Sequence, residues 1–119
     1  MDDTAELAPL TMFEYDHKPG HFCLMLTDSS MVGAVEEPFQ AAGFESNGYA
    51  WAGVARAAIQ AHAPRLDGRM GFDPEAGMFV AYGTDPQALR ELGLLLRRAL
   101  DEPPFLAALI STGDPEWFD

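Results

Sequence analysis

Four stretches of the chain carry apolar residues at the short spacing of β-strands, and turn residues join them in pairs. The four stretches are residues 10–16, 21–27, 69–73 and 78–82. Pro19-Gly20 separates the first two, and Asp73-Pro74 opens the turn between the last two. Proline fixes φ for a turn, and an aspartate carboxylate can accept from nearby backbone N–H groups. The pattern predicts two antiparallel hairpins.

Apolar residues at intervals of three and four predict two longer helices. The stripe of the first helix, within residues 49–62, consists of Trp51, Val54, Ala55, Ala58 and Ile59. The stripe of the second consists of Leu89, Leu92, Leu96, Ala99 and Leu100. Asn47 and Asp85 precede these helices and can cap their first turns, and Pro64 ends the first helix. Gly53 lies within the first helix, where glycine is unfavourable, and this indicates a close packing contact.

Two shorter helices complete the expected set. One begins near residue 31, is interrupted by Pro38 and ends at Gly43; the other covers residues 105–110. The order ββααββαα predicts an α+β fold with an antiparallel sheet built from two hairpins and helices packed largely on one face. No linker divides residues 1–119, so we expect a single domain. We expect residues 1–8 to form a loose acidic tail and residues 113–119 a polar tail with two aromatic residues.

Residues 72–83 read FDPEAGMFVAYG and contain the most informative strand. Because this strand is apolar on both sides, we expect it to be central in the sheet and covered on both faces, or nearly so. Asp73, Pro74 and Gly77 are explained by turn geometry, with Gly77 taking a positive φ at the exit of a four- or five-residue loop. Glu75 has no structural role that the pattern explains.

The chain is strongly acidic, with 19 acidic and 7 basic residues and a formal net charge of -12. Residues 1–55 hold nine of the acids and a single base, Lys18. This charge repels nucleic acid and anionic membranes and attracts basic partners, or it serves solubility alone. The acidic N-terminus lacks the apolar run of a signal peptide, and no stretch is long enough to span a membrane. We expect a cytoplasmic protein.

The residues that carry chemistry do not assemble into a catalytic motif. His17 and His21 flank a turn and Cys23 follows on the same strand, so a zinc site is conceivable, but histidines at a surface turn explain them more simply. Cys23 is the only cysteine and lies mid-strand, which favours a buried thiol over a nucleophile. We expect no catalytic residues, no metal site and no cofactor.

Two motifs together resemble a known family. Residues 47–55 read NGYAWAGVA, and residues 72–83 read FDPEAGMFVAYG. Their order and separation are similar to those of the immunity protein 51 family of bacterial polymorphic toxin systems. The motif residues are Gly48, Tyr49, Trp51 and Gly53 in the first segment and Asp73, Pro74, Glu75 and Gly77 in the second. The resemblance runs from about Phe13 nearly to the end of the chain.

This resemblance implies a small non-catalytic protein, encoded beside a toxin, that binds the toxin and blocks it. A basic toxin, such as a nuclease domain, would suit the charge of this chain. As partner-binding residues we predict four acids of the N-terminal half: Asp28, Glu36, Glu37 and Glu45. We expect the motif residues to be mainly structural, with Trp51 in the core and Tyr49 at a sheet edge or facing a partner. The alternative is a small-molecule-binding or regulatory α+β domain with a pocket between helices and sheet.

Overall fold

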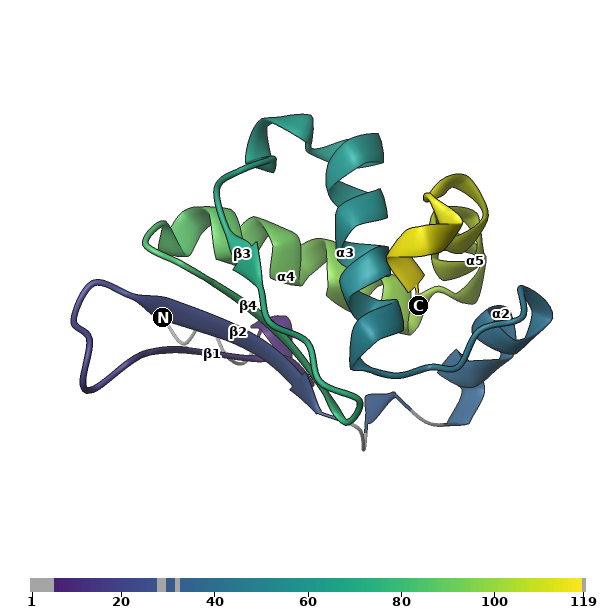
Figure 1. The fold of residues 1–119 in the computed structure, drawn as a ribbon, viewed down its shortest axis with the longest axis horizontal. Helices are drawn as coiled ribbons and strands as arrows, with labels where there is room; N and C mark the ends of the chain where they lie inside the picture. The colour runs from purple at the N-terminus through teal and green to yellow at the C-terminus, as the bar shows by residue number, and fades with distance from the viewer. Residues whose placement is uncertain (1–5, 28–29, 32, 119) are drawn as a thin grey trace.

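One open sheet of four antiparallel strands carries the helices of this α+β protein on one face (Figure 1). The structure is a computed structural model and describes residues 6–27, 30–31 and 33–118. The strands are β1 (Thr11–Glu14), β2 (Phe22–Thr27), β3 (Gly71–Phe72) and β4 (Met78–Gly83). The helices are α2 (Glu36–Ala41), α3 (Gly48–His62), α4 (Pro86–Asp101) and α5 (Pro103–Thr112). Short 3-10 turns are η2 (Gly33–Val35), η3 (Pro64–Leu66) and η4 (Pro115–Phe118). The predicted order and fold class are confirmed.

The strand order in the sheet is β1-β2-β4-β3, so the two predicted hairpins meet through β2 and β4. These central strands pair over their whole lengths, from Phe22 opposite Gly83 to Thr27 opposite Met78. Side chains alternate between the two faces of the sheet. Leu24 and Ala81 lie opposite each other on the face that joins the hydrophobic core.

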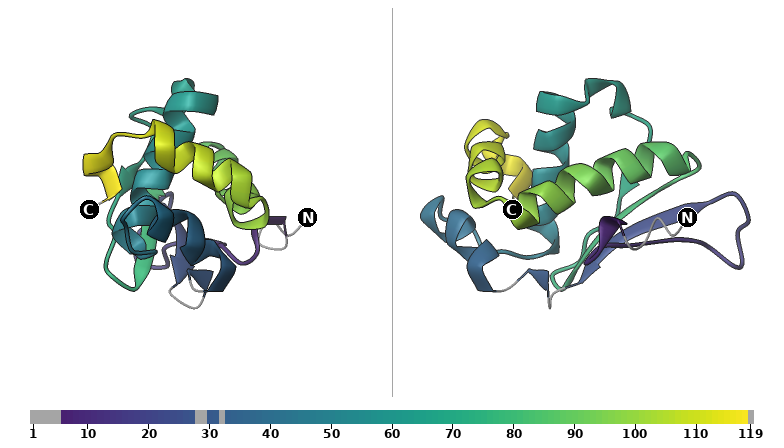
Figure 2. Two further views of the ribbon diagram at one scale, coloured as in Figure 1. Left: turned by 90° about the vertical axis from the view of Figure 1, so that its right-hand side faces the viewer. Right: turned by 180° about the vertical axis from the view of Figure 1, so that it is seen from behind.

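The helices form the second layer on that face of the sheet. Helices α3 and α4 both contact β4, and α4 also contacts β2. Helix α5 packs against α3 and α4, and α2 packs against α5 beyond the end of the sheet (Figures 1 and 2). The fully buried Trp51 of α3 meets the ring of Phe39 from α2, with 5.6 Å between the ring centroids.

Local chemistry sets the ends of the helices much as the sequence predicts. The Asn47 side chain accepts a hydrogen bond of 2.9 Å from the N–H of Ala50, and α3 ends just before Pro64. Gly43 adopts φ of +89° after α2 and ends that helix. Pro38 does not interrupt the helix, which is a correction. It lies in the first turn of α2, where a missing N–H leaves no intrahelical bond unmade.

The two ends of the chain are more structured than expected. Leu7 is fully buried, and the Arg97 guanidinium donates to the Glu6 carbonyl, so residues 6–8 belong to the packed structure rather than to a tail. Residues 1–5 lie outside the described part. Residues 115–118 form η4 rather than a polar tail, and the buried Phe118 ring lies 5.3 Å from that of Phe44, between centroids.

The expectation that residues 78–82 are covered on both faces, or nearly so, holds at Val80, which is 8% exposed, and is wrong at Tyr82. β4 is central, as predicted, but the helices of the described residues all lie on one side of the sheet (Figures 1 and 2). On the other side Tyr82 is 45% exposed. A strand that is apolar on both sides therefore exposes part of its apolar surface here.

Candidate functional site

The two sequence motifs meet where the start of α3 docks on the turn of the β3–β4 hairpin. The N–H of Gly48 donates to the Ala76 carbonyl at 3.1 Å. A Cβ at position 48 would lie 1.8 Å from the Glu75 carbonyl oxygen and 2.2 Å from that of Met78. Glycine is therefore required because two backbone segments approach too closely for any side chain.

The hairpin turn is tighter than the sequence predicts, and the carboxylates of Asp73 and Glu75 take no part in its hydrogen bonds. Glu75 and Met78 exchange backbone hydrogen bonds of 2.8 and 3.2 Å, which leaves a two-residue loop of Ala76 and Gly77. Gly77 does not take a positive φ, contrary to expectation. The expected side-chain role of Asp73 in the turn is also wrong, because only its backbone N–H bonds, to the Val80 carbonyl. Pro74 is half-buried at the start of the turn.

The remaining residues of the first motif divide into core and surface. The Trp51 indole N–H donates to the Ser46 hydroxyl at 3.1 Å, which satisfies its polar atom within the core. A Cβ at Gly53 would lie 2.7 Å from Phe118 Cδ1, so the predicted packing contact at Gly53 is with the C-terminal turn η4. Tyr49 is 40% exposed and is the one aromatic residue of this motif at the surface.

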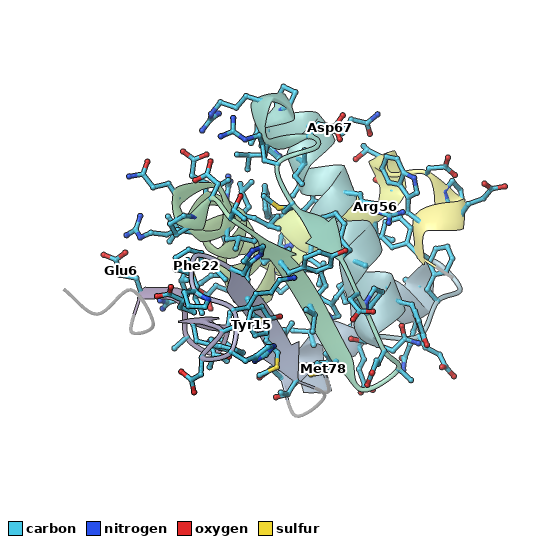
Figure 3. All side chains as sticks on the ribbon, turned by 60° about the vertical axis from the view of Figure 1, so that its left-hand side comes forward. Glu6, Tyr15, Phe22, Arg56, Asp67 and Met78 are labelled. Carbon is cyan, nitrogen blue, oxygen red and sulfur yellow. The ribbon has the colours of Figure 1, made fainter. Side chains whose placement is uncertain are left out.

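The side of the sheet turned away from the helices carries a set of apolar and aromatic side chains. We call this surface the outer face, and it consists of Phe13, Tyr15, Cys23, Met25, Val80 and Tyr82. Strand pairing sets these residues in rows: Phe13 lies opposite Cys23, which lies opposite Tyr82, and Met25 lies opposite Val80. Figure 3 labels Tyr15 at the sheet, Met78 at the start of β4 and Arg56 beside α3.

Two ionisable groups at the centre of the outer face are held neutral. A hydrogen bond with the Cys23 thiol, together with burial, raises the pKa of Tyr15 to about 12. Burial raises the pKa of the Cys23 thiol, and the bond with Tyr15 opposes that rise. The thiol is buried, as predicted, and its protonated state makes it a poor nucleophile. Both side chains are therefore uncharged at neutral pH.

Two carboxylates border the outer face where the chain runs from the edge strand β3 into the hairpin turn. Gly71 pairs with Tyr82, so by alternation Asp73 and Glu75 follow Gly71 on the outer side. Asp73 lies close enough to Tyr15 for its charge to contribute to the raised pKa of that hydroxyl. Both acids are exposed, and neither carboxylate has an ion-pair or hydrogen-bond partner within the described part of the chain. The rows of the outer face contain no lysine or arginine.

The helical layer has a different charge balance from the sheet. Five of the six arginines form ion pairs with acids in the described residues. The pairs are Arg65–Glu91, Arg69–Asp85, Arg90–Glu6, Arg97–Asp101 and Arg98–Glu102. The net negative charge of the protein therefore resides in acids away from these pairs, including those beside the outer face.

Of the four acids predicted to bind a partner, the three that the structure describes lie on α2 or on the loop that follows it. Asp28 lies outside the described residues. Glu36 and Glu37 begin α2, where Glu36 accepts from the N–H of Gly33 at 3.2 Å. Glu45 is exposed in the loop before α3. Helix α2 lies at the opposite end of the molecule from the β1–β2 turn (Figure 1). A partner-binding role for these acids stays a prediction.

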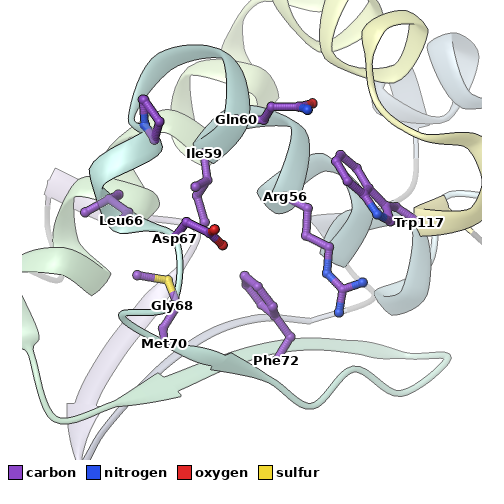
Figure 4. A pocket seen from close by; sticks show the side chains of 10 residues that line it. Arg56, Ile59, Gln60, Leu66, Asp67, Gly68, Met70, Phe72 and Trp117 are labelled. Carbon is purple, nitrogen blue, oxygen red and sulfur yellow. The ribbon is translucent and has the colours of Figure 1, made fainter.

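A cavity of about 480 Å³ opens between α3, η3 and the edge strand β3 (Figure 4). Arg56, Ile59, Asp67, Met70, Phe72 and Trp117 are among the residues that line it. The Arg56 guanidinium lies over the Phe72 ring, 5.4 Å from its centroid, and forms no ion pair with any residue that the structure describes. A cation beside aromatic rings can hold a planar or anionic group.

The structure gives little support for other chemistry. Within the described ranges, no three His, Cys, Asp or Glu side chains are placed to hold a metal ion. His17 instead packs beside Tyr15, with 5.6 Å between the ring centroids. None of the helices in the described residues is long and apolar enough to cross a membrane.

The sequence does not predict the outer face, because we expected the strand that carries Val80 and Tyr82 to be covered on both faces. One signal could have revealed it: Phe13 and Tyr15 share a face of the first strand that also carries a threonine. Polar and aromatic residues on one face are typical of partial exposure.

Comparison with known proteins identifies the family of this chain, but no individual protein that matches it. A family model described as immunity protein 51 matches residues 10–115, which include both motifs and all the strands and helices described above. No curated protein and no solved structure matches the chain.

Proposed function

The chain belongs to the immunity protein 51 family, and we propose that it binds and neutralises a cognate bacterial toxin by stoichiometric, non-catalytic inhibition. The observation that carries the proposal is the family match over residues 10–115. In this role the protein acts in the cytoplasm of the cell that makes the toxin. Inhibition of this kind needs a stable fold with an exposed binding surface and no chemistry of its own.

The charge of the protein supports a basic toxin as the partner. The formal net charge is -12, and at least five arginines are already paired with acids of the same chain. A toxin domain that acts on nucleic acid carries positive charge to hold phosphates, so it would be attracted electrostatically. Such attraction raises association rates, which suits an inhibitor that must capture a toxin as it is made.

The test is co-expression with the toxin domain encoded beside this gene. We expect cells that express the toxin domain alone to stop growing and cells that also express this protein to grow. Titration of the purified toxin domain by calorimetry should give a tight complex with a fixed stoichiometric endpoint. The same titration distinguishes binding from catalysis. If this protein inactivated the toxin as an enzyme, far less than one equivalent of it per toxin molecule would be enough. Rescue without a physical complex would refute stoichiometric inhibition.

The cavity beside Arg56 favours a second candidate function, that of a small-molecule-binding or regulatory domain. Its volume of about 480 Å³ is in the range of small-ligand sites, and its lining combines a cation with aromatic and apolar groups. A thermal-shift screen with planar and anionic metabolites tests this reading. A rise of several degrees that is lost in Arg56→Ala would support it, and no shift with any compound would count against it.

A further inference from the structure

We propose that the outer face is the surface on which the toxin docks, and that the toxin presents an apolar patch bordered by lysine or arginine residues. The inference rests on the proposed function and goes further, because it names the surface and the chemistry of the partner. It also differs from the set of acids predicted from the sequence. Glu36 and Glu37 lie on α2 and Glu45 lies on the loop that follows it, whereas the outer face belongs to the sheet.

The first argument is the exposed apolar area. Phe13 on β1 and Tyr82 on β4 are 42% and 45% exposed, and they lie in one row across the sheet on either side of the buried Cys23 of β2. Exposed apolar side chains that cluster, rather than scatter, mark binding surfaces. Tyrosine is enriched among the residues that dominate binding energy, because a rigid ring buries a large area at low entropic cost.

The second argument is that the surface is already shaped for binding. The Tyr82 ring lies over Gly71, where an added Cβ would be 2.5 Å from Tyr82 Cζ. The Phe13 and Tyr15 rings pack edge to face, with 5.6 Å between centroids. Side chains that are fixed before binding lose less conformational entropy when a partner covers them.

The third argument is charge complementarity, which distinguishes a basic toxin from a second copy of this chain. Asp73 and Glu75 border the apolar rows, and no lysine or arginine lies within those rows. A partner with positive charge at the rim would pair with both carboxylates. Two copies of the chain would instead bring together two molecules with a formal charge of -12 each, which opposes association.

The decisive variants are Tyr82→Arg on the outer face and Leu94→Arg on helix α4. Both replace a large, partly exposed side chain, since Leu94 is 39% exposed, and both add one positive charge. We expect Tyr82→Arg to weaken binding of the adjacent-gene toxin domain by about 30-fold or more, and Leu94→Arg by less than about 3-fold. Unfolding midpoints of both variants show that each is folded.

A second pair of variants compares the two candidate acidic surfaces at equal change in charge. One is Asp73→Lys with Glu75→Lys, and the other is Glu37→Lys with Glu45→Lys. Both double variants lose the same amount of long-range attraction. Only the first should also raise the dissociation rate, because only its carboxylates would contact the partner in the complex. If the second pair has the larger effect, the interface lies at α2 and the proposal is overturned.

A measurement on the unaltered protein avoids any question of folding. Methionine methyl groups labelled with carbon-13 report their surroundings in an NMR spectrum. We expect the signals of Met25 and Met78 to shift when the toxin domain is added, while that of the buried Met31 stays unchanged.

The outcomes separate this inference from the proposed function. If the wild-type protein binds no toxin domain, the proposed function fails. If it binds, but Tyr82→Arg behaves like Leu94→Arg and the Met25 signal does not move, the function stands and the docking surface is wrong. Light scattering of the protein alone tests whether a second copy of this chain, rather than the toxin, binds to the outer face. A dimer that Tyr82→Arg dissociates and Leu94→Arg does not would assign the outer face to a second copy.

Discussion

Replacing Gly48 by alanine should destabilise the fold far more than a single added methyl group normally does. The added Cβ would lie 1.8 Å from the Glu75 carbonyl oxygen, whereas ordinary contact is roughly 3.5 Å. Both of its nearest neighbours are backbone atoms of the hairpin turn, so they cannot rotate away as a side chain could. The hairpin and α3 must therefore separate.

The expected magnitude follows from two losses. Overpacking a tight contact costs about 1–3 kcal/mol, and the Gly48 to Ala76 hydrogen bond contributes about 1 kcal/mol more if it breaks. We expect the free energy of unfolding to fall by about 3 kcal/mol. For a chain of this length each kcal/mol corresponds to roughly 3–5 °C, so the melting temperature should fall by about 10 °C.

Gly93→Ala in helix α4 is the matched control. Its added Cβ would lie 2.8 Å from Leu7 Cδ2, the far end of a flexible side chain. Alanine is also about 1 kcal/mol more favourable than glycine in a helix interior, which offsets the cost of moving Leu7. We expect the free energy of unfolding of Gly93→Ala to stay within about 1 kcal/mol of wild type.

Urea unfolding, followed by circular dichroism, measures both variants under one set of conditions. The reasoning is refuted if Gly48→Ala loses no more stability than Gly93→Ala. That result would mean that the hairpin turn yields at low cost, and the family motif would need another explanation for its glycine.

Three further predictions concern the ends of the chain and its titratable groups. Phe118→Ala should lower the free energy of unfolding by about 3 kcal/mol or more in urea titrations, because the ring is buried against Gly53; an unchanged value would show that η4 does not stabilise the core. A bond from the Ala88 N–H lowers the pKa of Asp85, so the stability it gives is present above an unfolded pKa of about 4 and is lost as pH falls below it. Asp85→Asn should therefore flatten the acid side of the stability profile, and an unaltered profile would contradict this. Because the pKa of Tyr15 is raised to about 12, the stability that its protonated hydroxyl gives is lost as pH rises from 10 toward that value. The titration is followed by absorbance at 295 nm, and the component that is absent in Tyr15→Phe should titrate near this pKa.

The sequence predicts the elements of this fold well because their signals are local. The caps at Asn47 and Asp85, the stop at Pro64 and the αL glycine at position 43 each depend on residues within one or two turns. Position 38 shows the limit of such rules. Proline is unfavourable inside a helix but acceptable in its first turn, so the effect depends on where the helix begins, and that is the least local property of the element.

The contacts between distant segments could not be predicted in the same way. Gly48 and Gly53 indicate close approach, but the sequence does not say that the partners are the hairpin turn and η4. Phe118 and Leu7 are buried, but they lie in segments near the chain ends that are too short to give a periodic signal. The candidate site was missed for the same reason: whether an apolar strand face is covered depends on where the helices pack.

Helix α3 explains why the outer face stays open. Ten of its fifteen residues are buried, on all sides of the helix, and most are small: Gly48, Ala50, Trp51, Ala52, Gly53, Val54, Ala55, Ala57, Ala58 and Ile59. A helix that is apolar all round has to be enclosed. The sheet covers one side of α3 through β4, and α4, α5, η3 and η4 cover the others. These elements therefore pack around α3, and no helix of the described residues covers the second face of the sheet.

A change that makes α3 amphipathic, such as Ala57→Glu, should therefore destabilise the packing of α5 and η4 while leaving the outer face unaltered. Circular dichroism and the Met25 methyl signal would report these two effects separately.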